Sequence, residues 1–212
     1  GAWRISRAGV LTRRATAIET LGSATVLCTD KTGTLTENRM QVELVTSNAI
    51  TWRRNDSSPP VNKIREVLYA ARGASAPVPT DPMDRAIHES SPASQADVLP
   101  SLLHSYGLRP DLFATTNIWR AADGVTITAY AKGAPEAIAD LCRLSEASRA
   151  KLLKEVDSFA TEGLRLLAVA DATFAPLDFV KPKSQRDISF DYVGLVGFAD
   201  PLRETVPAAV RE

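Results

Sequence analysis

Residues 28–36 read CTDKTGTLT and are the first candidates for chemistry in this sequence of 212 residues. Asp30 follows an apolar run and precedes a turn that is rich in threonine and contains one glycine. A carboxylate at the end of a short strand lies where open α/β sheets bind ligands, and it can attack a phosphoryl group. The threonine hydroxyls and the backbone N–H groups near Gly33 suit a phosphate. The same pattern also fits a metal ligand, or a turn aspartate that satisfies its own backbone.

The seven residues DKTGTLT, from Asp30 onward, resemble the phosphorylation motif of the P-type ATPases. The resemblance implies that Asp30 is the nucleophile phosphorylated by ATP, that Asp30 and the carbonyl of Thr32 help to hold Mg²⁺, and that Thr34 contacts phosphate. In phosphatases of the haloacid dehalogenase-like superfamily, the residue at the position of Thr32 is usually a second aspartate that acts as general acid and base. Threonine cannot do this at neutral pH, so we expect a phosphoenzyme that persists, as a pump requires.

A second segment, KGAPE at 132–136, places a lysine at a predicted strand end beside a glycine and a predicted helix N-terminus, which suits an anion. It resembles the family motif in which the lysine, here Lys132, lines the ATP pocket and the glycine, here Gly133, lets the nucleotide approach. Arg165 opens an otherwise apolar strand, and in the family this arginine reaches the nucleotide phosphates. The plainer alternatives are a solvated lysine at a strand-to-helix junction and an arginine that extends from the strand end to solvent.

Two further positions resemble the family's adenine site, each with a departure. Asp84 ends the segment DPMD at 81–84, where the family usually has a glutamate that meets the adenine amino group. Its side chain is one methylene shorter, and an acid in a first helical turn also simply complements the helix dipole. Where the family stacks adenine on phenylalanine, this sequence offers Leu108, with Tyr106 or Phe113 as substitutes. Because an aliphatic platform loses aromatic stacking, we expect weak and less selective nucleotide binding.

The segment DPLR at 200–203 resembles the family's hinge, where the chain returns from the nucleotide domain to the phosphorylation domain. The resemblance implies that Arg203 contacts phosphate or bridges the two domains. Asp200 also fits the N-cap of a following helix, and the two interpretations can hold together.

The elements that must position these residues alternate in type along the chain. Periodicity predicts strands at 24–29, 40–46, 113–120, 125–131, 164–172 and 190–198, and helices at 61–72, from 81 onward, from 135 onward, at 146–161 and at 205–211. The fold class is therefore α/β or α+β, with an antiparallel middle. The resemblance implies a nucleotide-binding domain with an antiparallel sheet flanked by helices, inserted in a partial haloacid dehalogenase-like (Rossmann-type) phosphorylation domain.

Composition limits the function classes. The 25 basic and 25 acidic side chains balance, which gives no general attraction to nucleic acid. Cys28 and Cys142 lie in apolar contexts and indicate a reducing compartment rather than a disulfide scaffold. No apolar run approaches the ~20 residues that span a bilayer. The basic segment at 1–20 fits either a solvated helix face or a membrane-proximal cytoplasmic segment.

We therefore expect a stalk end and the first part of a phosphorylation domain at 1–37, a nucleotide-binding domain at 38–199, and the start of the return into the phosphorylation domain at 200–212. The expected protein is a cytoplasmic fragment of an ATP-driven membrane cation pump, with ATP and Mg²⁺ as cofactors. Its partners are the rest of the pump in cis and, through absent transmembrane helices, the transported cation. The alternatives are a soluble dehalogenase-like phosphatase and a stand-alone nucleotide-binding module. Because the family's other phosphate and magnesium motifs do not occur in this sequence, we expect the chain alone to bind ATP without turnover.

Overall fold

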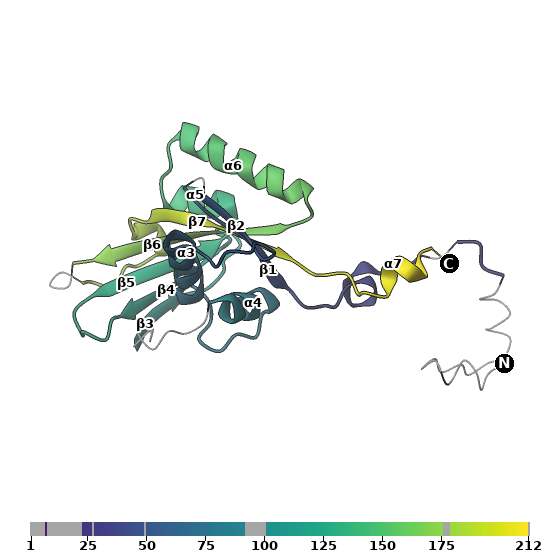
Figure 1. Cartoon of the computed structure of the whole chain (residues 1–212). Helices are drawn as coiled ribbons and strands as arrows, with labels where there is room; N and C mark the ends of the chain where they lie inside the picture. The colour runs from purple at the N-terminus through teal and green to yellow at the C-terminus, as the bar shows by residue number, and fades with distance from the viewer. Residues whose placement is uncertain are drawn as a thin grey trace.

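The computed structural model describes residues 7, 23–26, 28–48, 50–91, 101–175 and 179–211. Figure 1 shows a sheet with helices on both faces, and two chain segments that extend from one end of it. We call these two segments, residues 28–39 and 200–211, the neck.

The sheet has seven strands and every neighbouring pair is antiparallel. In sheet order these are β2 (Ile50–Arg53), β1 (Gln41–Ser47), β7 (Asp191–Ala199), β6 (Arg165–Phe174), β5 (Ile127–Gly133), β4 (Ala114–Arg120) and β3 (Ser101–Tyr106). The predicted antiparallel sheet flanked by helices is confirmed. The two edge strands β2 and β3 were not predicted, because both are largely exposed and lack the apolar alternation of a half-buried strand.

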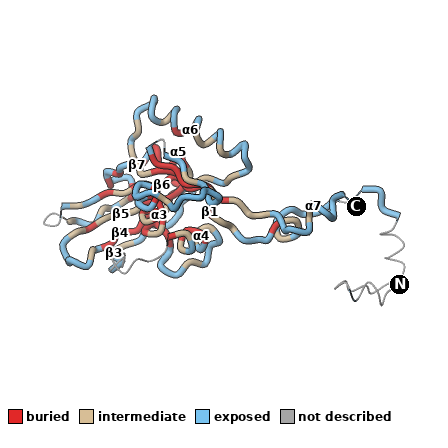
Figure 2. The backbone as a smooth tube through the Cα atoms, viewed as in Figure 1, coloured by how far each residue is buried: buried red, intermediate tan, exposed pale blue. Residues whose placement is uncertain are grey.

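Helices cover both faces and divide the core into two clusters, which Figure 2 shows as the buried centre of the sheet. On one face lie α3 (Asn62–Gly73) and α4 (Pro82–Ser90), and on the other lie α5 (Pro135–Leu141) and α6 (Glu146–Thr161). Alternation along β6 shows the division, because Val169 packs with α3 and α4 whereas Ala168 and Ala170 pack with α5 and α6. Within the described ranges, the other short helical segments are η1 (Lys31–Leu35), η3 (Gln185–Asp187) and α7 (Val206–Ala209).

Side chains fix both ends of the loop at 74–80 that joins α3 to α4. Trp119 Nε1 donates to the Gly73 carbonyl at 2.8 Å, and Asn117 Nδ2 donates to the Gly73 and Ser75 carbonyls at 3.0 and 2.8 Å. At the far end Asp81 caps α4 by accepting from the N–H groups of residues 83 and 84, as the sequence predicts. The loop is therefore held against β4 on one side and against α4 on the other.

The predicted buried strand at 24–29 is wrong. Residues 23–26 and 28–30 form no strand, Val26 is 78% exposed and Cys28 is exposed. A strand needs a neighbour for its backbone hydrogen bonds, and no strand of the described sheet pairs with this segment. The predicted basic segment at 1–20 lies outside the described residues, except for Arg7. Over the described ranges, no helix is long and apolar enough to cross a membrane.

Candidate functional site

The strand register brings one group of the predicted residues to the end of the sheet next to the neck. β5 ends at Gly133, which pairs with Ala168 of β6, and β6 begins at Arg165, which pairs with Phe198 of β7. β7 then leads directly into Asp200 and the neck. Antiparallel neighbours place the end of one strand beside the beginning of the next, so Lys132, Gly133 and Arg165 share this end of the sheet.

Lys132 and Arg165 also share one face of the sheet. Arg165 precedes Leu167 by two residues, and Leu167 packs in the cluster of α3 and α4, so the exposed Arg165 side chain starts from the same face. Lys132 lies two residues after Tyr130, which also packs in that cluster. The Lys132 ammonium contacts Ser75, in the segment between α3 and α4, directly. Lys132 therefore contacts the 74–80 loop, and Arg165 lies on the same face at the beginning of the neighbouring strand.

Lys132 is buried, with 7% of the residue exposed. Its Nζ donates to Ser75 Oγ at 2.7 Å and forms an ion pair with Asp84 Oδ1, while Asp84 Oδ2 accepts from the Ala76 N–H at 3.0 Å. Burial lowers the pKa of Lys132, and the contact with Asp84 opposes that shift. The structure thus joins two residues that the sequence predicts separately. It also adds Ser75, which no motif in the sequence singles out.

Gly133 has a structural reason to be glycine that is independent of any nucleotide. A Cβ atom at this position would lie 2.2 Å from the Phe113 carbonyl oxygen and 2.6 Å from the Ala114 Cα. The adjacent Ala134 N–H donates to the same Phe113 carbonyl at 2.9 Å. Close approach of the segment before β4 therefore excludes any side chain here.

Of the three predicted adenine platforms, two remain exposed. Tyr106 is half-buried and its hydroxyl donates to the Pro182 carbonyl at 2.5 Å. Leu108 is 66% exposed and Phe113 is 62% exposed, and both lie in the connection between β3 and β4. Because the backbone of Phe113 adjoins Gly133 and Ala134, this connection borders the same end of the sheet.

His88 of α4 lies near this cluster. Its Nε2 is buried and has no hydrogen-bond partner among the residues that the structure describes. Burial, reinforced by the positive charge of Arg72, lowers the pKa of His88, and the Asp84 carboxylate opposes that shift. The sequence offers no metal-type spacing for this residue, and the structure places it partly buried in α4.

The second group of predicted residues lies in the neck, around the Asp30 turn. Asp30 is exposed and its Oδ1 accepts from the Lys31 N–H at 2.7 Å, so this carboxylate caps the turn η1. Gly33 has a φ of 79°, which favours glycine, and its N–H donates to Thr36 Oγ1 at 3.1 Å. Thr32 and Thr34 are exposed on this turn.

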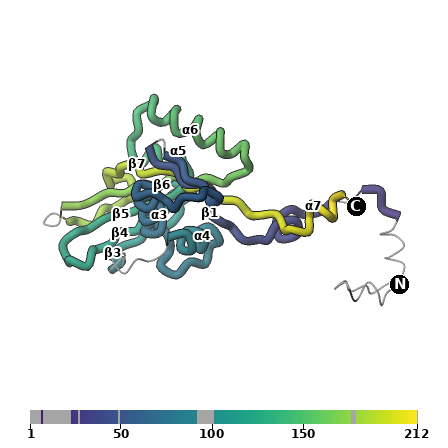
Figure 3. The backbone as a smooth tube through the Cα atoms, in the orientation of Figure 1, coloured from purple at the N-terminus to yellow at the C-terminus, as the bar shows by residue number. Residues whose placement is uncertain are grey.

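The return segment holds the Asp30 turn in place, and the two runs of the neck lie side by side in Figure 3. Thr36 is buried and donates to Asp200 Oδ2 at 2.5 Å, while Asp200 Oδ1 accepts from the Arg39 N–H at 3.1 Å. Arg203 Nη2 donates to the Gly33 carbonyl at 3.0 Å. Arg203 therefore bridges the two runs of the neck. Asp200 is not an N-cap, because α7 begins only at residue 206 and is preceded by Thr205.

The described residues supply only part of a magnesium site. Within those ranges, no three histidine, cysteine, aspartate or glutamate side chains gather as a metal site. Mg²⁺ is usually held by one or two carboxylates together with substrate phosphates and water. The Asp30 carboxylate and the Thr32 carbonyl are oxygen donors of the right kind, so they fit such a site without completing it.

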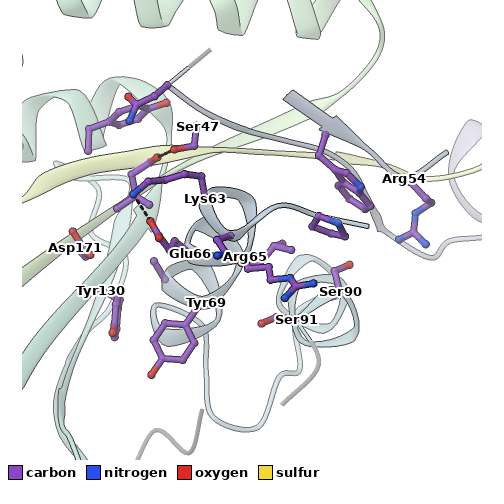
Figure 4. Close-up of a pocket in the computed structure, with 18 of the residues that line it drawn as sticks. Ser47, Arg54, Lys63, Arg65, Glu66, Tyr69, Ser90, Ser91, Tyr130 and Asp171 are labelled. Carbon is purple, nitrogen blue, oxygen red and sulfur yellow. Dashed lines mark hydrogen bonds and ion pairs between the residues drawn. The ribbon is translucent and has the colours of Figure 1, made fainter. Parts of the chain in front are cut away.

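A wide groove of about 1440 Å³ lies elsewhere, along α3 and the neighbouring part of the sheet (Figure 4). Tyr69, Tyr130 and Asp171 line one part of it, and Arg54 and Ser91 line another. None of the residues that the sequence predicts for the site is among its lining residues. The motif residues, and not the size of the groove, therefore identify the candidate site.

Comparisons with known proteins agree with the fold. Residues 115–205 match the family described as "P-type ATPase, cytoplasmic domain N". The chain is 29% identical to the cation-transporting ATPase pma1 of Synechocystis over 99% of its own length and 28% of that protein. It is also 29% identical to a putative cation-transporting ATPase of Methanocaldococcus jannaschii, over 100% of its own length and 23% of that protein.

The chain spans about a quarter of the length of these two relatives. The matched residues begin in β4 and run past the end of β7, so they include both Lys132 and Arg165. The part of the chain from β4 to just past β7 is therefore similar to the cytoplasmic domain N of P-type ATPases.

Proposed function

We propose that this chain binds ATP at the neck end of the sheet, on the face covered by α3 and α4. We propose further that Asp30 is the residue phosphorylated when the chain works within a cation pump. The observation that carries both proposals is the connection between the two groups of residues. The Asp30 turn is tied by Arg203 and Asp200 to the end of β7, the strand that pairs with Arg165.

In the binding step, the exposed Arg165 guanidinium meets the nucleotide phosphates, and its planar fork suits them. Lys132 supplies a second positive charge at the end of the neighbouring strand. The adenine rests on the exposed apolar side chain of Leu108 or Phe113. Binding is weak if Leu108 is the platform, because an aliphatic side chain gives burial without aromatic stacking.

In the transfer step, a carboxylate oxygen of Asp30 attacks the γ-phosphorus in line. The bond from that phosphorus to the oxygen bridging to the β-phosphate breaks, and ADP leaves with the electron pair. Such a transfer requires little beyond positioning and charge neutralisation. Bound Mg²⁺, held in part by Asp30 and the Thr32 carbonyl, would supply neutralising positive charge. Thr32 cannot act as the acid or base for hydrolysis, so the phosphoaspartate persists.

For the whole protein, we propose an ATP-driven cation pump in which this chain lies on the cytoplasmic side of a membrane. In this proposal, residues 1–37 are the end of a stalk and the first part of a phosphorylation domain. Residues 200–212 begin the return into that domain, which the rest of the protein completes. Residues 38–199 form the inserted nucleotide-binding domain. The support is the DKTGTLT motif together with the names of the two relatives, which are cation-transporting ATPases.

Calorimetric titration of the chain with ATP tests the binding step. We expect measurable binding, and an Arg165→Ala variant should bind about tenfold more weakly, because one charge-assisted hydrogen bond is worth roughly 1.5–3 kcal/mol. Arg120→Ala is the matched control, since Arg120 is exposed at the opposite end of β4. Equal affinities of the Arg165 and Arg120 variants would place the phosphates elsewhere, and the absence of any ATP binding would reject the proposal.

The transfer step is tested in a longer protein that contains this chain. With γ-labelled ATP we expect an acid-stable label that Asp30→Asn abolishes and that Asp56→Asn, an exposed aspartate of the β2–α3 connection, leaves intact. Label that survives Asp30→Asn would exclude Asp30 as the nucleophile. Sustained ATP hydrolysis by the chain alone, lost on Asp30→Asn, would favour a soluble phosphatase instead.

A further inference from the structure

We propose that Asp84 is a positioning residue, and not an adenine contact, and that together with Ser75 it couples Lys132 to the 74–80 loop. The expected consequence is that this coupling sets the affinity for every nucleotide irrespective of its base, and this consequence rests on the proposed function. Three groups carry it: the Asp84 carboxylate, the Lys132 ammonium and the Ser75 hydroxyl.

Both oxygens of Asp84 bind within the chain. Oδ1 forms the ion pair with Lys132, and Oδ2 accepts from the Ala76 N–H at 3.0 Å. The Asp84 side chain is only 14% exposed. Because this side chain is largely buried and both of its oxygens already accept hydrogen bonds within the chain, Asp84 faces the protein and not a ligand.

The Lys132 ammonium is the centre of the coupling. It donates to Ser75 Oγ at 2.7 Å, and the Ser75 hydroxyl in turn donates to the Ala71 carbonyl at 2.8 Å. Only 8% of the Lys132 side chain is exposed. Because a buried charge is tolerated when it is paired and hydrogen-bonded, Asp84 and Ser75 together make the buried position of Lys132 possible.

The loop is held from two sides, and Lys132 and Asp84 form one of them. On the other side, Asn117 of β4 donates to the Ser75 carbonyl at 2.8 Å, and Thr115 Oγ1 donates to the Ala74 carbonyl at 3.4 Å. Removing Asp84 therefore frees the Ala76 N–H and deprives Lys132 of its counter-charge. Since both effects act on the frame of the site, ATP and GTP should be affected equally.

The chain titrated calorimetrically with ATP and with GTP separates positioning from base recognition. Asp84→Asn should weaken both nucleotides by a similar factor of about tenfold, which leaves the ATP:GTP ratio unchanged. Ser75→Ala should weaken both by a few-fold, again at constant ratio. A loss of ATP affinity with GTP unaffected would identify Asp84 as the adenine contact and overturn the proposal, as would unchanged affinity for both nucleotides.

Asp81→Asn is the matched control. It removes a negative charge that also acts on Lys132, yet asparagine caps a helix as well as aspartate does. Its nucleotide affinities should stay within about twofold of those of the unsubstituted chain. A loss equal to that of Asp84→Asn would mean that local charge, and not the specific contacts of Asp84, sets the affinity.

A nucleotide-free arm keeps the test independent of the proposed function. Asp84→Asn can destabilise the fold, so two further variants are studied by NMR: Lys132→Met, and the double variant Lys132→Met with Asp84→Leu. Thermal melting first confirms that each variant folds. We expect the Ser75 and Ala76 amide signals to shift, and their exchange with solvent to accelerate, in Lys132→Met. Unchanged Ser75 and Ala76 signals would overturn the coupling even if no nucleotide bound. Changed signals without nucleotide binding would support the coupling and reject only the proposed function.

Discussion

The sheet domain and the neck are built in different ways. In the sheet, residues such as Phe198, Val196 and Leu195 are fully buried between two helical layers. In the neck, Asp30, Thr32 and Thr34 are exposed, and hydrogen bonds from Thr36 and Arg203 hold their turn. The proposed binding half therefore has a core of its own, whereas the proposed nucleophile sits on a turn whose shape depends on the return segment.

The largest effect should come from the core next to the neck. Phe198→Ala should lower the free energy of unfolding by roughly 3–5 kcal/mol, because a fully buried ring is lost and a cavity remains. Asp30→Asn, on the exposed turn, should change it by less than about 0.5 kcal/mol. Chemical denaturation of the two variants measures the contrast. A large loss of stability in Asp30→Asn would show that the neck contributes to the fold of the sheet.

A smaller effect should come from the strand packing at Gly133. Gly133→Ala places a Cβ atom against the Phe113 carbonyl and should cost about 2 kcal/mol of unfolding free energy. Gly107→Ala is the control, because a Cβ atom there meets no heavy atom within 4 Å. If the melting temperatures of both variants stay close to that of the unsubstituted chain, packing does not explain the glycine at position 133. Close approach of a nucleotide then becomes the better explanation.

A local effect should appear in the neck. Thr36→Val keeps the shape of the side chain and removes its hydrogen bond to Asp200, which should cost about 1 kcal/mol. The Arg39 amide, which donates to the same carboxylate, should then exchange with solvent about fivefold faster, while the melting temperature of the sheet stays constant. A cooperative drop in the melting temperature would instead join the neck and the sheet into one unit.

The smallest effect is a pH dependence of the stability of the sheet domain, which arises from His88 of α4. Burial lowers the pKa of His88 from its ordinary 6.5, so the unfolded chain binds more protons than the folded chain just below that pH. The stability that His88 contributes is fully present above pH 6.5 and falls as the pH drops toward the lowered value. His88→Gln should flatten this part of the stability curve. A slope that is the same in both proteins would assign it to other groups.

Periodicity and local signals predict the interior of the sheet well. The Asp81 cap followed by Pro82, the strands β4 and β5, and the helix α6 were predicted from local patterns, and the structure contains each of them. The strand at 24–29 failed because its apolar run has no partner strand in the described structure. Local sequence records that a run can form a strand, but not whether a neighbour is present to receive its hydrogen bonds.

The sequence predicts individual residues of the candidate site, but it does not predict which of them contact one another. Lys132 and Asp84 stand in recognisable motifs, yet their ion pair joins positions 48 apart in sequence and depends on how α4 packs beside β5. Ser75 and Ala76 lie in a loop where no sequence motif indicates a contact with Lys132 or Asp84. The groove along α3 likewise arises from tertiary packing, and the motif residues do not line it.

The most direct test of the central claim is an NMR titration of the chain with ATP that maps the backbone amides that shift. Our account predicts shifts at residues 74–80, 132–134 and 165 and in the connection at 107–113, all at the neck end of the sheet. Shifts confined to the groove, for example at Asn48, Tyr69 and Asp171, would contradict it.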